Sequence, residues 1–135
     1  MPRLHCQLIG APVDSGQRRP GCLMGPAAYR TAGLAQALEG LGHQVSDLGD
    51  VACRPVPASS DNPAVHHLPE TLGWLEALAR AGQAAAGQGM PIFLGGDHSL
   101  SLGSVAGMAA FAAAQNRPLF VLWLDAHSDF HTLAT

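Results

Sequence analysis

The sequence predicts an α/β fold in which helices cover both faces of an open parallel sheet, a three-layer α/β/α arrangement. Three observations lead to this prediction. Short apolar runs of strand length alternate along the chain with longer segments of helical periodicity. The last run, residues 119–124, is apolar at every position, which is typical of a parallel strand buried on both faces. Polar clusters directly follow the last two runs, where the ligand sites of such sheets lie.

The first half of the chain supplies two strands with a helix between them. We expect the strands at residues 4–10 and 44–48. Pro26 marks the start of the helix, because proline at the first helical position loses no hydrogen bond. Gly42 can end that helix in a left-handed cap.

The second half continues the alternation after a long connection. Residues 51–68 contain prolines and serines without a periodic pattern, so they predict a surface loop. Beyond it we expect a helix from Pro69 to Gln88, a strand at residues 91–94, a helix around Val105, Met108 and Ala112, and a last strand at residues 119–124.

Composition and charge exclude several classes of function. All 7 basic residues are arginine, so chemistry that needs a Schiff-base lysine or the lysine of a phosphate-binding loop is excluded. With a sequence pI of about 6.1 and no basic run, the chain offers no electrostatic surface for nucleic acid or for an anionic membrane. Its apolar runs are far shorter than the roughly 20 residues of a membrane span. The expected ligand is therefore a small molecule, and a cationic one suits the charge.

Length, cysteines and the N-terminus bear on organisation and location. A chain of 135 residues has the length of one domain. Cys6, Cys22 and Cys53 are odd in number and lack a C-x-x-C spacing, so we expect free thiols. The first residues lack the pattern of a signal peptide, which leaves a cytoplasmic location as the default expectation.

The strongest chemical signal is a set of alternating metal-ligand residues. Asp125, His127 and Asp129 follow the apolar run 119–124, and an extended backbone would point all three side chains to one side. His98, after the preceding strand, is a natural fourth ligand. Carboxylate and imidazole ligands without thiolate suit manganese, iron or zinc, and a bridging carboxylate can span two ions about 3.5–4 Å apart.

Simpler roles compete with this interpretation. A lone His98 could be a loop or core residue, and Asp97 or Asp129 alone could cap a helix. Gly95 and Gly96 could make a tight turn, or could let the backbone approach a metal or substrate. The trio favours a metal, because burying two carboxylates without a cation is costly.

Other chemistries find little support. No G-x-G-x-x-G follows the first strand, which weakens a dinucleotide site. Ser99 and Ser101 lack the G-x-S-x-G setting of a nucleophile. Trp74 and Trp123 are expected to be packing residues rather than a substrate platform.

Residues 95–99, Gly-Gly-Asp-His-Ser, and residues 125–129, Asp-Ala-His-Ser-Asp, resemble the two N-terminal metal-binding signatures of the ureohydrolases, the family of arginases and agmatinases. Residues 9–12 and 25–34 resemble arginases in particular. The resemblance implies two manganese ions, with His98 and Asp129 on one, His127 on the other, and Asp125 bridging both.

The resemblance also implies an activity and its partners. A hydroxide shared by the two ions, held by a hydrogen bond to Asp129, would attack a guanidinium carbon and release urea. L-arginine, giving L-ornithine, is the expected substrate, with agmatine or guanidinobutyrate as the alternatives. Family members usually form trimers or hexamers.

One residue departs from the arginase pattern. Where arginases have an asparagine that contacts the substrate α-carboxylate, this sequence has His131. Because histidine can also donate a hydrogen bond to a carboxylate, arginine stays possible. The choice between arginine and another guanidino compound is open.

Length is the larger departure, since family members are about twice as long and their second half supplies further ligands. It also supplies two strands that lie between the third and fourth strands predicted here. We therefore expect residues 1–135 to be the N-terminal half of a single α/β domain with an incomplete sheet. If 135 residues is the whole protein, an inactive metal-binding fragment is the alternative.

Overall fold

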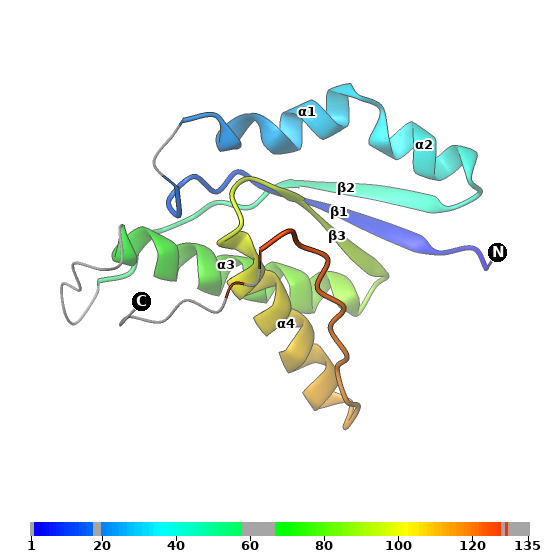
Figure 1. The fold of residues 1–135 in the computed structure, drawn as a ribbon. Coiled ribbons are helices and arrows are strands. Elements are labelled where there is room, and N and C mark those ends of the chain that lie inside the picture. Colours follow the sequence, from blue (N-terminus) through cyan, green and yellow to red (C-terminus); the bar gives the residue numbers. More distant parts are fainter. Residues whose placement is uncertain (1, 18–19, 58–66, 128, 130–135) are drawn as a thin grey trace.

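The computed structural model describes residues 2–17, 20–57, 67–127 and 129. Figure 1 shows a sheet with helices α1 and α2 on one face and helices α3 and α4 on the other. The predicted α/β class, with helices on both sides of a parallel sheet, is confirmed. Among the described residues no helix is long and apolar enough to cross a membrane.

The sheet has the order β2-β1-β3, and both strand pairs are parallel. Its strands are β1 (His5–Ala11), β2 (Gln44–Asp50) and β3 (Met90–Gly95), which confirms three predicted strands to within a few residues. Cys6 pairs with Val45 on one side and with Met90 on the other. Because β1 is central and covered on both faces, every residue from Cys6 to Ala11 is buried.

The predicted first helix is two short helices, α1 (Gly25–Thr31) and α2 (Leu34–Gly40). Gly33 separates them with a φ of 81°, a left-handed conformation that cannot continue a right-handed helix and that glycine adopts without strain. Gly42 is left-handed as expected, with a φ of 89°. A short 3₁₀ turn, η1 (Cys22–Met24), precedes α1.

Helices α3 (Leu68–Ala86) and α4 (Leu100–Ala114) confirm the other two helix predictions. They pack on each other through Gly103 and Gly107 of α4. A Cβ on Gly107 would lie 2.5 Å from the carbonyl oxygen of Ala79, so only glycine permits this approach. On the sheet side, Trp74 and Leu78 of α3 form the core with Ala11, the last residue of β1, and Val13, which follows it.

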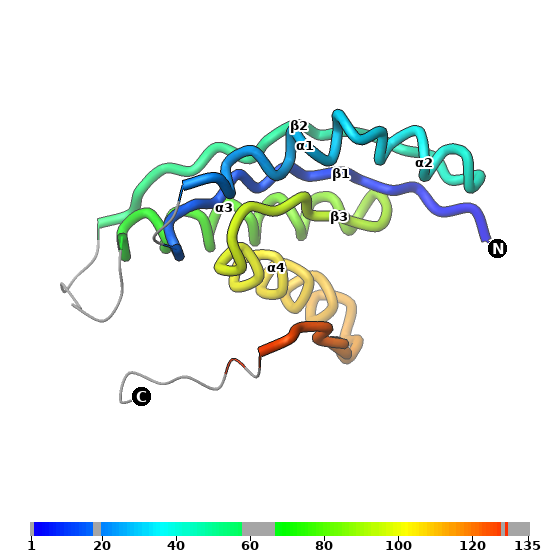
Figure 2. The backbone as a smooth tube through the Cα atoms, turned by 45° about the horizontal axis from the view of Figure 1, so that its top comes forward, coloured from blue at the N-terminus to red at the C-terminus, as the bar shows by residue number. Residues whose placement is uncertain are grey.

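The fourth predicted strand is wrong. Residues 119–124 have no regular secondary structure. Residues 119–122 line a pocket together with residues of α4 and β3, and Figure 2 shows the segment running along α4. Phe120, Leu122 and Leu124 are 88%, 83% and 86% exposed. The run has the apolar pattern of a buried strand. Among the described residues, however, β3 pairs only with β1, and no strand lies between β3 and residues 119–124. A strand without a neighbour has no hydrogen-bond ladder to stabilise it.

Candidate metal centre

The turn after β3 places His98. Gly96 donates a backbone hydrogen bond to Ala11 (3.2 Å), and Asp97 donates one to Val13 (2.9 Å). A Cβ on Gly96 would lie 2.4 Å from the carbonyl oxygen of Val13, so this position requires glycine. The tight-turn interpretation of the glycine pair thus has a structural basis in the approach of two backbone segments.

Asp97 stabilises the same turn through hydrogen bonds to its side chain. Its side chain is buried, with 7% exposure, and accepts hydrogen bonds from the N–H of Gly16 (2.7 Å) and the N–H of Ser99 (2.9 Å). The Ser99 hydroxyl is a third donor to the same carboxylate. Asp97 therefore joins the segment after β1 to the start of α4, a hydrogen-bonding role of the kind expected of a capping carboxylate.

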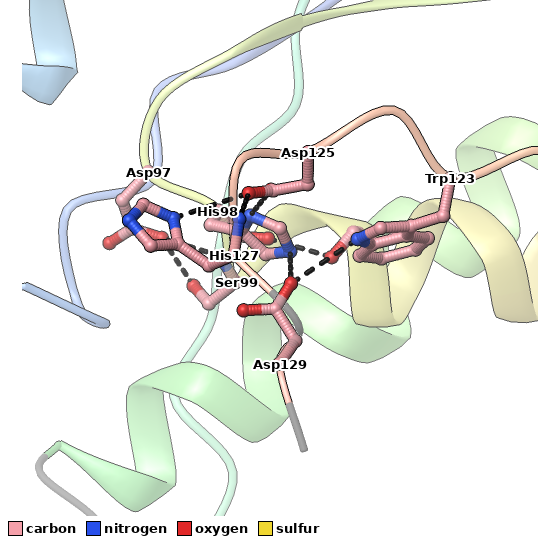
Figure 3. A network of polar contacts seen from close by, with 8 residues as sticks. Asp97, His98, Ser99, Trp123, Asp125, His127 and Asp129 are labelled. Carbon is pink, nitrogen blue, oxygen red and sulfur yellow. Dashed lines mark hydrogen bonds and ion pairs between the residues drawn. The ribbon is translucent and has the colours of Figure 1, made fainter. Parts of the chain in front are cut away.

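Three predicted ligands come together beyond the carboxyl end of β3. His98, Asp125 and Asp129 each offer one ligand atom, and these atoms all lie within 4.8 Å of one another. His98 Nδ1 is 3.2 Å from Asp125 Oδ2, and His98 Nε2 is 3.6 Å from Asp129 Oδ2. Figure 3 shows the imidazole between the two carboxylates. No other such group of three ligand residues occurs in the described part of the chain.

His127 lies at the edge of this cluster, outside the group of three. Its ring Nδ1 is 3.2 Å from Asp125 Oδ1, and its side chain is 85% exposed. The chain bends at residues 126–127, and the backbone N–H of His127 donates to Asp125 Oδ1 (2.8 Å). The expected extended geometry is therefore absent here, and the alternation does not point the three side chains to one side.

The surroundings of Asp125 favour its charged form. The backbone N–H of His127 is the largest cause that holds the pKa of this carboxyl below its ordinary value, and the neighbouring imidazoles act in the same direction. An ionised carboxylate that faces two histidines is a suitable ligand for a dication.

Trp123 is the site residue that the sequence prediction missed. Expected to be a packing residue, it donates a hydrogen bond from Nε1 to Asp129 Oδ2 (3.2 Å) and lies against the ring of His98. It stands two residues before Asp125, so the alternation that selected the acidic residues already included it. His131, the predicted substrate contact, lies outside the described residues.

An open pocket of about 430 Å³ adjoins the cluster. Its lining residues are His98, Ser99, Ser101, Leu102, Trp123 and Asp129. The volume is in the range of small-molecule sites. Another pocket lies between β3, α4 and residues 119–122, but no titratable side chain lines it, so we place the candidate chemistry at the pocket beside His98.

Comparison with known proteins places this chain in one class of protein. The model of the arginase family matches residues 4–135. The arginase of Agrobacterium fabrum is 52% identical over 132 residues, and that of Brucella melitensis is 49% identical over 133 residues. The structure of arginase from Bacillus caldovelox aligns with a TM-score of 0.69 at 35% identity, covering 79% of this chain and 37% of that one.

The chain belongs to the arginase family. The matches cover 96% and 98% of it but only 41% and 44% of the Agrobacterium and Brucella proteins, of which they are the N-terminal part. The chain thus spans less than half the length of these relatives.

Proposed function

We propose that this chain carries part of a binuclear manganese centre of an amidinohydrolase that converts L-arginine and water to L-ornithine and urea. The observation that carries the proposal is the position of Asp125 between two histidines. Its Oδ2 faces His98 and its Oδ1 faces His127, each at 3.2 Å from a ring nitrogen. A carboxylate that presents one oxygen to each of two imidazoles is arranged to bridge two ions.

The distances suit metal ligands. Two ligand atoms about 2.1 Å from one ion and at right angles to each other are about 3 Å apart. The two contacts of Asp125 and the 3.6 Å contact between His98 and Asp129 are close to that separation. Nitrogen and oxygen donors without thiolate fit manganese. In this assignment His98 and Asp129 would hold one ion, His127 would hold the other, and Asp125 would be a ligand of both.

Divalent manganese, when bound, would lower the pKa of water enough to supply hydroxide near neutral pH. The chain's own residues would orient the reactants. Asp129 lines the pocket and presents Oδ2 near His98, so it can accept a hydrogen bond from the attacking hydroxide. The pocket at this position would hold the guanidinium group next to the carboxylates.

The relatives that are named arginases support a guanidino substrate. The charge of the cluster does not select the substrate, because two bound dications would outweigh its two carboxylates. Agmatine and guanidinobutyrate stay as alternative substrates, because His131 replaces the asparagine expected to contact the α-carboxylate of arginine.

The domain organisation and assembly belong to the same proposal. We infer that residues 1–135 form the N-terminal half of one α/β domain, whose remaining strands would cover the exposed run 119–124. A cytoplasmic trimer or hexamer is the expected assembly.

Urea release tests the proposal. The product of the complete gene, loaded with Mn²⁺, is given arginine, agmatine or guanidinobutyrate, and urea is measured. Faster release from arginine than from the other two supports the arginase assignment. Release from agmatine or guanidinobutyrate alone would move the assignment to that substrate, and no release from any of them contradicts the proposal.

Metal analysis addresses the fragment alternative. Equilibrium dialysis of the 135-residue chain against Mn²⁺, followed by elemental analysis, counts the ions that it holds. Urea release by the complete product, together with weak or no Mn²⁺ binding by the chain alone, would show that this chain by itself is the inactive fragment.

A further inference from the structure

Trp123 contacts two of the three clustered ligands. Its indole N–H donates to Oδ2 of Asp129 at 3.2 Å. Its ring lies against the imidazole of His98, with centroids 5.3 Å apart and planes tilted by 46°. One side chain therefore joins the ligand of the β3–α4 turn to the last ligand of the segment 125–129, as Figure 3 shows.

The hydrogen bond leaves the carboxylate free to bind. An ionised carboxylate has about four lone-pair sites, of which the indole N–H occupies one. The oxygen that it contacts is the same Oδ2 that faces His98 Nε2. The bond thus fixes the direction of Asp129 relative to His98 and keeps the other lone pairs available. Outer partners of this kind orient metal ligands in proteins generally.

Trp74 shows what a packing tryptophan looks like in the same chain. It is 7% exposed, belongs to the core with Leu78, and its Nε1 has no hydrogen-bond partner. Trp123 is 47% exposed, so burial contributes less to its placement. Its contacts with His98 and Asp129 account for its orientation better than core packing does.

We propose that Trp123 is a positioning residue of the metal centre, whose N–H orients Asp129 and whose ring restricts the rotation of His98. This inference rests on the proposed function, since it takes both residues to be metal ligands. Trp123 also lines the pocket proposed for the guanidinium group, but the inference assigns it no bond to the metal.

The first test measures the affinity of the complete gene product for Mn²⁺ by competition with a chelator. Trp123→Phe keeps an aromatic ring and removes the N–H, and we expect it to weaken binding about 10-fold. Trp123→Leu removes the ring contact as well and should weaken binding further. Trp74→Phe makes the same chemical change away from the site and should leave the affinity unchanged. Far-UV circular dichroism checks that each variant is folded.

The second test needs no metal. The chain has 2 tryptophans, so its NMR spectrum holds two indole N–H signals, which Trp74→Phe assigns. Asp129→Ala should shift the Trp123 indole signal and leave that of Trp74 in place. Trp123→Leu should shift the ring protons of His98, because the ring current of the indole is lost.

The outcomes separate this inference from the function on which it rests. Equal Mn²⁺ affinity in Trp123→Phe, Trp123→Leu and the unsubstituted complete product overturns the positioning role and leaves the metal centre intact. An unmoved Trp123 indole signal in Asp129→Ala also overturns it. No Mn²⁺ binding and no urea release by the unsubstituted complete product would instead mark a failure of the proposed function itself, and the role of Trp123 would fall with it.

Discussion

The Nδ1 atom of His98 lies 3.2 Å from Oδ2 of Asp125, although the whole of α4 separates the two residues in the chain. The turn after β3 and the segment after residue 124 therefore meet at one point. That meeting, rather than either motif alone, forms the candidate site for a cation.

Asp125→Asn should weaken Mn²⁺ binding more than about 100-fold, since loss of even an outer partner of a ligand costs about 10–100-fold. The amide keeps the size of the side chain but removes the charge that would bridge two ions. Equilibrium dialysis or chelator competition measures the effect. Glu76→Gln makes the same change on the exposed face of α3 and serves as the matched control. Similar affinities in the two variants would contradict the assignment.

Asp97→Ala should lower the free energy of unfolding by about 2–4 kcal/mol, because it leaves buried donors on Gly16 and Ser99 without their acceptor. Urea denaturation gives the value. Glu39→Ala on the exposed face of α2 should change it by less than about 0.5 kcal/mol. If Asp97→Ala lowers the free energy of unfolding no more than Glu39→Ala does, the hydrogen bonds to Asp97 contribute nothing to stability.

Gly107→Ala should destabilise the protein by about 1–3 kcal/mol, although alanine is the better helix former. The added Cβ would meet the backbone of Ala79 at 2.5 Å, and backbone cannot give way as a flexible side chain can. Gly40→Ala is the matched control, because nothing lies within 4 Å of its Cβ position, and it should be neutral or stabilising. Thermal unfolding of the two variants decides whether the α3–α4 approach requires glycine.

Acid should weaken the contact between α1 and β2. Arg30 donates to Asp47 at 2.7 Å and to Asp50 at 2.6 Å, and the hydrogen bond from Arg30 is the largest cause that lowers the pKa of Asp47. Because that pKa is depressed in the folded state, the pair stabilises the protein above the ordinary carboxyl pKa and the contribution is lost as the pH falls below about 4.

Arg30→Gln tests this contact. It should cost about 1 kcal/mol at neutral pH, because the pair is partly exposed, and should flatten the loss of stability between about pH 5 and about pH 3. Urea midpoints across that range, at low and high salt, measure both effects. An unchanged acid slope in the variant would assign the pH dependence to other carboxylates.

Local sequence patterns predicted the long helices and the strands that have a neighbouring strand in the sheet. The buried run of β1, the start of α3 at Pro69 and the presence of α4 follow from residue type and spacing. The break at Gly33 was not predicted, because a single glycine costs a helix only about 1 kcal/mol and so does not by itself end it. Residues 119–124 have the composition of a buried strand, but pairing depends on a partner that the sequence of the run does not specify.

The sequence likewise predicted part of the candidate site. His98, Asp125 and Asp129 could be selected because their residue types and their positions after apolar runs both point to a metal. The bend at residues 126–127, where the N–H of His127 donates to Asp125, is a local feature that a simple alternation of residue types does not describe. Trp123 was assigned to packing because an aromatic residue in an apolar run has no feature that distinguishes packing from orienting a ligand.

The two halves of the ligand cluster differ in how firmly the fold holds them. His98 follows a paired strand and the buried Asp97, whereas Asp125 and Asp129 follow an exposed segment without regular structure. A cation bound to both halves would act as a cross-link that closes a loop through α4, much as a disulfide closes a loop of chain. Its binding energy would add to the folding free energy through mass action, so the melting temperature should rise with free Mn²⁺ concentration.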